Sequence, residues 1–205
     1  MCERGWSAIS ILKDYRVVVE SIIEQAEKFY QLGYQMSNGG NLSARVPGTD
    51  YMIVKGTDVA FSELSPETLV VTDFDGRIIE GDIKPSKESL LHGAIYRKLP
   101  HVMAIMHCHS PWATAYAAKH DELEFSTYHS KMKLKGVCPV FNTGSYVVPE
   151  HYFGQILEWF DRHPQMNSFI LRGHGQVTVG RDMREAAMLA ELVEETAKIA
   201  LLSKL

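Results

Sequence analysis

Apolar residues recur along the chain at two spacings, one typical of amphipathic helices and one typical of short strands. Over 17–32 they lie three or four positions apart, and Gly33 follows as a helix stop. Helix-starting residues followed by the same spacing predict four more helices, over 85–99, 112–119, 149–162 and 182–201. Helices are therefore expected along the whole length of the chain.

Short apolar runs of strand length lie between these helices. They cover 42–46, 51–54, 69–72, 77–79, 101–106, 137–141, 169–171 and 176–179. Asp75-Gly76 is a two-residue turn signal that predicts an antiparallel hairpin between the third and fourth runs. Strands mixed with helices in this way predict a layered α/β or α+β fold. No repeat or linker interrupts the pattern, so we expect one domain over residues 1–205.

Composition and charge narrow the class of protein. The chain has 205 residues, and 21 Lys and Arg against 25 Asp and Glu give a net charge of −4. This balance lacks the basic excess of a nucleic-acid-binding protein. Cys2, Cys108 and Cys138 form no close pair, which is typical of a reducing compartment. No run approaches the roughly 18 apolar residues of a membrane helix, and no secretory signal is expected. We expect a cytoplasmic protein with no nucleic-acid or membrane partner.

His107 and His109 form the sharpest local signal for chemistry. They follow an apolar strand-like run, and side chains two apart on a strand project to the same face. Neutral imidazole is a favoured zinc ligand, so both rings can converge on one metal ion. Histidines also cap strand ends through hydrogen bonds, and the spacing alone leaves both interpretations open.

Two further segments offer partners for a metal. His174 lies between two glycines directly after an apolar run, although, taken alone, a plain turn with an incidental histidine explains it better. Glu88 belongs to the first turn of a predicted helix, where the helix dipole alone favours a carboxylate. His92 lies four residues later on the same face and is a candidate fourth ligand or a partner of a ligand.

The segment 37–41 reads Ser-Asn-Gly-Gly-Asn and can form a concavity of backbone N–H donors for an anion. Asn-Gly is also the commonest signal for a plain hairpin turn. Ser86, at the start of a predicted helix, offers a second anion contact. No dinucleotide or P-loop motif is present, so no nucleotide cofactor is expected.

Taken together, these pieces resemble the class II aldolase/adducin family, which includes the L-fuculose-1-phosphate aldolases. The four matching motifs occur in the family's order and span most of the chain: Gly39-Gly40-Asn41-Leu42-Ser43, Pro85-Ser86-Lys87-Glu88, His107-Cys108-His109 and Gly173-His174-Gly175. The resemblance implies a three-layer α/β/α sandwich around a largely antiparallel mixed sheet. It also implies a homotetramer with active sites at the subunit contacts.

The same resemblance assigns roles to individual residues. His107, His109, His174 and Glu88 would hold Zn²⁺ or another divalent metal such as Co²⁺, Mn²⁺ or Fe²⁺. Glu88 would also act as acid and base, and Tyr128 would protonate the departing aldehyde oxygen. Substrate or phosphate contacts are implied for Asn38, Gly40, Asn41, Thr57, Ser86 and Lys87.

The activity implied is reversible cleavage of a small ketose 1-phosphate into dihydroxyacetone phosphate and an aldehyde, through a metal-stabilised enediolate. The same site supports a decarboxylase or an epimerase of a phosphorylated sugar or keto acid, and a non-catalytic adducin-like interaction module is the alternative from another class. Two positions depart from the aldolases. Lys87 stands where they commonly carry a second serine, and Asp58 stands where they carry glycine after a threonine. Asp58 would repel a phosphate, whereas Lys55 and Lys87 would attract one.

Overall fold

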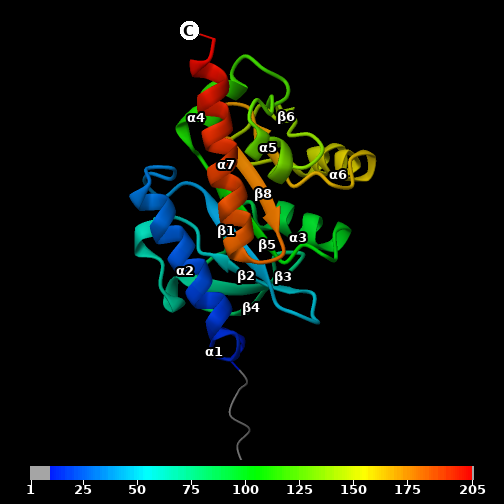
Figure 1. The fold of residues 1–205 in the computed structure, drawn as a ribbon. Coiled ribbons are helices and arrows are strands. Elements are labelled where there is room, and N and C mark those ends of the chain that lie inside the picture. Colours follow the sequence, from blue (N-terminus) through cyan, green and yellow to red (C-terminus); the bar gives the residue numbers. More distant parts are fainter. Residues whose placement is uncertain (1–9, 205) are drawn as a thin grey trace, which may run out of the picture.

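The computed structural model of the chain describes residues 10–204, and its centre is a single mixed sheet (Figure 1). Its strand order is β4-β3-β2-β1-β5-β8-β7-β6, and each pairing is antiparallel except that of β6 with β7. The strands are β1 (Asn41–Arg45), β2 (Tyr51–Lys55), β3 (Leu69–Asp73), β4 (Ile78–Glu80), β5 (Ala104–Cys108), β6 (Val140–Phe141), β7 (Ser168–Leu171) and β8 (Gly175–Gly180).

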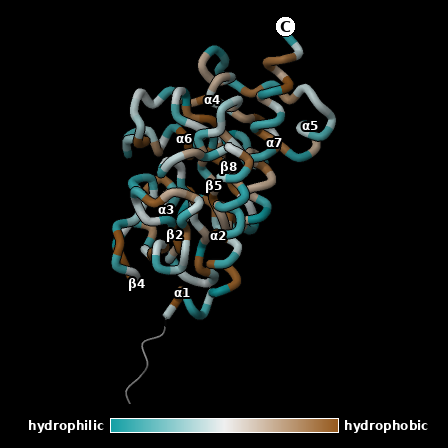
Figure 2. The backbone as a smooth tube through the Cα atoms, turned by 90° about the vertical axis from the view of Figure 1, so that its left-hand side faces the viewer, coloured by the Kyte–Doolittle hydropathy of each residue, from teal (hydrophilic) through white to brown (hydrophobic). Residues whose placement is uncertain are grey.

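Helices cover both faces of this sheet and make the fold a three-layer α/β/α sandwich. They are α1 (Ile11–Asp14), α2 (Arg16–Gln31), α3 (Ser89–Lys98), α4 (Pro111–Ala117), α5 (Tyr128–Lys133), α6 (Phe153–Arg162) and α7 (Met183–Leu202). One face packs against α2, α4 and α7, and the other against α3 and α6 (Figure 2). The expected fold class is confirmed.

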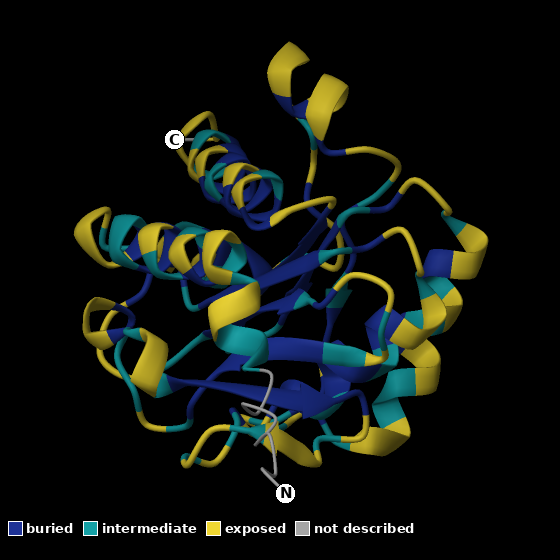
Figure 3. Cartoon of the chain, turned by 90° about the horizontal axis from the view of Figure 1, so that it is seen from below, coloured by how far each residue is buried: buried dark blue, intermediate teal, exposed yellow. Residues whose placement is uncertain are grey.

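Apart from the exposed edge strand β4, the strands are largely buried because both faces of the sheet are covered, so most read as continuous apolar runs (Figure 3). β1 and β5 lie next to each other in the middle of the sheet, and β8 lies on the other side of β5. The polar loops at one end of these three strands therefore converge, although they are far apart in the sequence.

Several predicted boundaries were wrong: the strand expected over 137–141 covers only Val140–Phe141, the helix expected from residue 149 begins at Phe153, and α5 was not predicted. Two further shifts bear on the polar loops at the end of the central strands. The strand expected over 101–106 begins at Ala104 and runs through Cys108, so it includes His107. The helix expected from Pro85 or Ser86 begins at Ser89. Pro85 forms a bridge with Gly56, and the Ser86 N–H donates to the Lys55 carbonyl, which keeps this segment extended beside β2.

Cys108 and Cys138 are buried free thiols, and Cys2 lies outside the described residues. Among residues 10–204, no helix combines the length and the apolar character needed to cross a bilayer.

Candidate metal centre

The neighbouring strands β5 and β8 bring three histidines together. His107 lies within β5, His109 follows one residue after its end, and His174 lies in the turn that connects β7 to β8. The Nε2 atom of His107 is 3.1 Å from that of His109 and 3.3 Å from that of His174. One ligand nitrogen from each ring lies within 4.8 Å of the others. Strand alternation predicted that His107 and His109 share one face of a strand. The pairing of β5 with β8 brings His174 to them.

Burial favours the neutral form of the three imidazoles. His107 is fully buried, which lowers its pKa to about 3, with a further contribution from His109. Burial likewise lowers the pKa of His174 to about 4 and lowers the pKa of His109. Neutral imidazole is the form that binds a metal ion.

The hydrogen bonding of His107 directs its lone pair into the cluster. Its Nδ1 is 2.9 Å from the carbonyl oxygen of Gln176, which can only accept, so Nδ1 carries the proton and Nε2 is free. Tetrahedral zinc with bonds of about 2.0–2.1 Å separates its ligand nitrogens by roughly 3.3 Å, close to the spacing in this cluster. Among residues 10–204, His174 Nδ1 is buried without a hydrogen-bond partner. The donor set and its spacing therefore fit a divalent metal.

Glu88 directs its carboxylate at the same cluster. Its Oε2 is 3.2 Å from His107 Nε2, and its Oε1 is 3.9 Å from His174 Nδ1. The Asn41 side-chain amide donates to Oε2 at 3.1 Å, and the Val148 N–H donates to Oε1 at 3.4 Å. Glu88 is the residue before α3 rather than part of its first turn, and its side chain does not cap the helix. The contacts of the Glu88 carboxylate therefore orient it toward the histidine cluster and not toward the backbone at the start of α3.

His92 does not join the three clustered histidines. Its Nδ1 is 2.8 Å from the Ser43 hydroxyl on β1, and burial lowers its pKa to about 3. Of the two roles left open for His92, fourth ligand or partner of a ligand, the geometry disfavours the first.

The loop 37–41 enters β1 beside the histidines and packs closely against Gln35. A Cβ on Gly40 would overlap the Gln35 side-chain oxygen, and a Cβ on Gly39 would lie 2.8 Å from His109 Nδ1. Gln35 is buried, and its oxygen accepts the His109 N–H at 2.8 Å. Sequence reasoning missed Gln35, because a glutamine in a polar loop gives no local signal for such a contact.

The other predicted anion contacts surround this loop. Asn38 is exposed, and its amide is 3.5 Å from Asp58 Oδ1. The buried Lys55 ammonium donates to the carbonyls of Asn38 and Val59, and burial lowers its pKa to about 8. Ser86 is buried and Thr57 half-buried, beside the end of β2. Lys87 is exposed, with its ammonium 6.0 Å from the centre of the Tyr146 ring.

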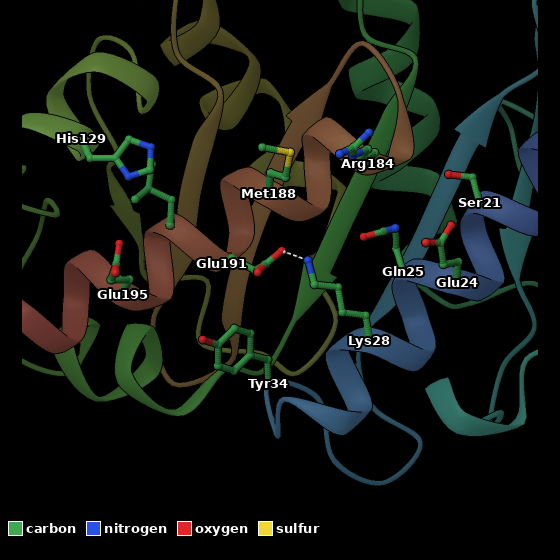
Figure 4. Close-up of a pocket in the computed structure, with 11 residues that line it drawn as sticks. Ser21, Glu24, Gln25, Lys28, Tyr34, His129, Arg184, Met188, Glu191 and Glu195 are labelled. Carbon is green, nitrogen blue, oxygen red and sulfur yellow. Dashed lines mark hydrogen bonds and ion pairs between the residues drawn. The ribbon is translucent and has the colours of Figure 1, made fainter.

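Tyr128 is exposed to solvent within one chain. It is the first residue of α5, and 93% of its surface is exposed. A separate groove of about 910 Å³ lies between α2 and α7 (Figure 4). His107, His109 and His174 are not among the residues that line it. An ion pair between Lys28 and Glu191 joins the two helices there, with its two atoms 2.5 Å apart.

Comparison with known proteins identifies relatives along nearly the whole chain. The profile of the family described as "Class II Aldolase and Adducin N-terminal domain" matches residues 20–201. A 3-oxo-tetronate 4-phosphate decarboxylase of Haemophilus influenzae is 34% identical and covers 88% of this chain and 85% of its own length. An L-fuculose phosphate aldolase of Methanococcus maripaludis is 32% identical, covering 83% of this chain and 88% of its own.

A methylthioribulose-1-phosphate dehydratase of Marinobacter nauticus is 29% identical over 88% of this chain and 90% of its own. The crystal structure of L-fuculose-1-phosphate aldolase from Thermus thermophilus superimposes with a TM-score of 0.79 at 26% identity. That match covers 91% of this chain and 94% of the aldolase. Relatives with one fold therefore carry three named activities.

Proposed function

Because the chain belongs to the class II aldolase and adducin family, we propose that it is a divalent-metal lyase acting on a small phosphorylated sugar or sugar acid. The observation that carries this proposal is the convergence of His107, His109 and His174, with Glu88 beside them. These four residues would hold the metal, with zinc as the first candidate and Co²⁺, Mn²⁺ or Fe²⁺ as the others. A complete ligand set argues against an adducin-like module without activity.

The chemistry needs a charge-stabilising centre and a group that moves protons. A bound divalent ion supplies the first, as a Lewis acid that stabilises negative charge developing on substrate oxygens. Glu88 supplies the second, because its two oxygens face the cluster and are oriented by Asn41 and Val148. It would take a proton from the substrate or return one to the carbon left after bond cleavage.

The anionic end of the substrate would bind on the loop 37–41 and its surroundings. Gly40 allows the backbone to approach closely, and Asn38, Thr57, Ser86 and Lys87 lie on the adjoining segments. The buried Lys55 ammonium adds a positive charge that contacts the backbone carbonyls of Asn38, in the loop 37–41, and of Val59. A phosphate bound there would place the neighbouring carbons of the substrate toward the histidines.

Aldol cleavage of a ketose 1-phosphate is the first candidate reaction, and decarboxylation of a phosphorylated keto acid is the second. The relative that is 34% identical and is named a 3-oxo-tetronate 4-phosphate decarboxylase supports the second candidate. An epimerase would need further acid and base groups, and we place none within the described site.

The resemblance gives Tyr128 the role of proton donor in aldol cleavage, and this side chain is exposed within its own chain. We propose that the chain forms a homotetramer in which Tyr128 reaches the site of a neighbouring subunit. Mixing Glu88→Gln and Tyr128→Phe subunits tests this arrangement. In tetramers formed at random from equal amounts, each site takes Glu88 from one subunit and Tyr128 from its neighbour. Each of these residues is unmutated in half of the subunits, so about a quarter of the sites would regain activity. Mixtures no more active than the two variants alone would contradict a shared site.

Metal content and product analysis test the proposed function as a whole. We expect about one divalent ion per chain, bound far less tightly after His109→Gln. Candidate ketose 1-phosphates should yield dihydroxyacetone phosphate, and a phosphorylated 3-keto acid should yield carbon dioxide if decarboxylation is the reaction. Less than about a tenth of an ion per chain after zinc supplementation would contradict the proposal, since a built site fills more completely.

A further inference from the structure

A ladder of buried polar contacts connects β1 to α3 and ends at Glu88. Strand alternation directs Asn41, Ser43 and Arg45 to the α3 side, while Leu42 and Ala44 pack in the core on the α2 side. On α3 and the residue before it, Glu88, His92 and Tyr96 lie four positions apart on one helix face. The two rows lie opposite each other along the length of the helix.

Each rung of the ladder is a specific hydrogen bond. The Asn41 amide donates to Glu88 Oε2 at 3.1 Å, and the Ser43 hydroxyl lies 2.8 Å from both His92 Nδ1 and the Tyr96 hydroxyl. The Tyr96 hydroxyl also donates to the Ser43 carbonyl at 2.9 Å. At the far end, the Arg45 guanidinium donates to the Tyr96 carbonyl.

The middle rung, formed by Ser43, His92 and Tyr96, lies in the core. Ser43 and Tyr96 are completely buried, and His92 is 1% exposed. Burying polar groups costs free energy unless every group is paired, and apolar side chains would fill the same space without that cost. Hydrogen bonds are directional, so this rung restricts sliding of α3 along β1 in a way that apolar packing does not.

The position of Glu88 depends on such a restraint. Its side chain makes no cap bond to α3, and its backbone carbonyl accepts the His92 N–H at 3.2 Å. His92 is thus one helical turn from Glu88 and is the next residue along that face with a side-chain bond to β1. A shift of α3 at His92 would move the Glu88 carboxylate relative to His107, which is paired with Asn41 across β1 and β5.

We propose that Ser43, His92 and Tyr96 are positioning residues that set the distance between the Glu88 carboxylate and the three histidines. This inference rests on the proposed role of Glu88 as a metal ligand. It assigns a function to a buried serine and tyrosine that carry no chemistry themselves.

Cobalt binding tests this inference without any substrate. Ser43→Ala removes the middle rung, and Thr178→Val is its matched control. Thr178 is equally buried, and its hydroxyl donates to the Ala186 carbonyl at 2.7 Å on the α7 side of the sheet. Both variants lose one buried hydroxyl, and both should lower the urea midpoint. Only Ser43→Ala should weaken Co²⁺ binding, by roughly tenfold, as residues that orient metal ligands do.

The visible spectrum of the Co²⁺ protein identifies the ligand that moves. Glu88→Gln gives the spectrum of a site without its carboxylate, and Ser43→Ala should shift the wild-type spectrum toward it. Tyr96→Phe keeps the ring and should shift it in the same direction to a smaller extent. Equal Co²⁺ affinity and unchanged spectra for Ser43→Ala and Thr178→Val would overturn the inference and leave the metal site standing. Wild-type protein that binds no Co²⁺ would overturn the proposed function and this inference with it.

Discussion

Two residues at the candidate anion loop have a strained backbone, Ser37 within the loop and Asp58 next to it, and Asp58 also carries a negative charge. Ser37 has φ +56° and Asp58 has φ +58°, in the left-handed region that favours glycine. Asp58 adds a carboxylate 3.5 Å from the Asn38 amide, at the position where the resembling aldolases carry glycine. The Asp58 carboxylate would lower the affinity of this loop for a phosphate.

Asp58→Gly should strengthen the binding of inorganic phosphate several-fold, because it removes a nearby negative charge. Stability should change by no more than about 1 kcal/mol, since relief of strain opposes the added freedom of the unfolded glycine. Calorimetric titration with phosphate and urea unfolding measure the two effects. Ser37→Gly relieves similar strain without changing charge, so equal phosphate affinities in the two variants would contradict a role for the Asp58 carboxylate.

At the scale of elements, the middle of α3 approaches the β3–β4 turn closely. Gly93 is buried in α3, and a Cβ there would overlap the backbone carbonyl of Phe74. The turn and the helix are in direct backbone contact, which a side chain would separate. Gly93 therefore favours packing at the expense of helix propensity.

Gly93→Ala should destabilise the protein by about 1–3 kcal/mol, because the cost of overpacking exceeds the gain in helix propensity. Gly154→Ala is the matched control in α6, where a Cβ would meet nothing within 4 Å. It should leave stability unchanged or raise it by up to about 1 kcal/mol. Urea unfolding of both variants measures the difference, and a Gly93→Ala variant as stable as Gly154→Ala would refute the close contact.

For the whole molecule, buried neutral histidines couple stability to pH. Burial lowers the pKa of His92 and His107 to about 3 and that of His174 to about 4. In the unfolded chain the same side chains bind protons near pH 6.5. Below that pH the unfolded state holds more protons than the folded state, so acid favours unfolding.

The metal-free protein should therefore have its full stability above about pH 6.5 and lose it as the pH falls. Each histidine that is protonated only in the unfolded chain lowers the free energy of unfolding by about 1.4 kcal/mol for each pH unit of acidification. Urea midpoints in excess chelator between pH 7.5 and 5.5 measure this slope above the range where carboxylates titrate. A midpoint that stays constant over this range would show that the imidazoles are not neutral and buried together.

The order of four motifs along the chain carried the resemblance to a family. Local spacing in the sequence was enough to predict most elements and the shared face of His107 and His109. These features depend on residues a few positions apart, where helix and strand periodicity decides which side chains lie together. The mixed, largely antiparallel sheet followed from the resemblance and was confirmed by the structure.

Only the tertiary structure decided which segments became neighbours. The pairing of β5 with β8 brings His174 to His107, and the pairing of residues 84–86 with the end of β2 delays the start of α3 until Ser89. The same long-range contacts place His92 against Ser43 and leave Tyr128 in solvent. The physical reason is that such pairings depend on surfaces distant in sequence, and no local periodicity encodes which surface each residue will meet.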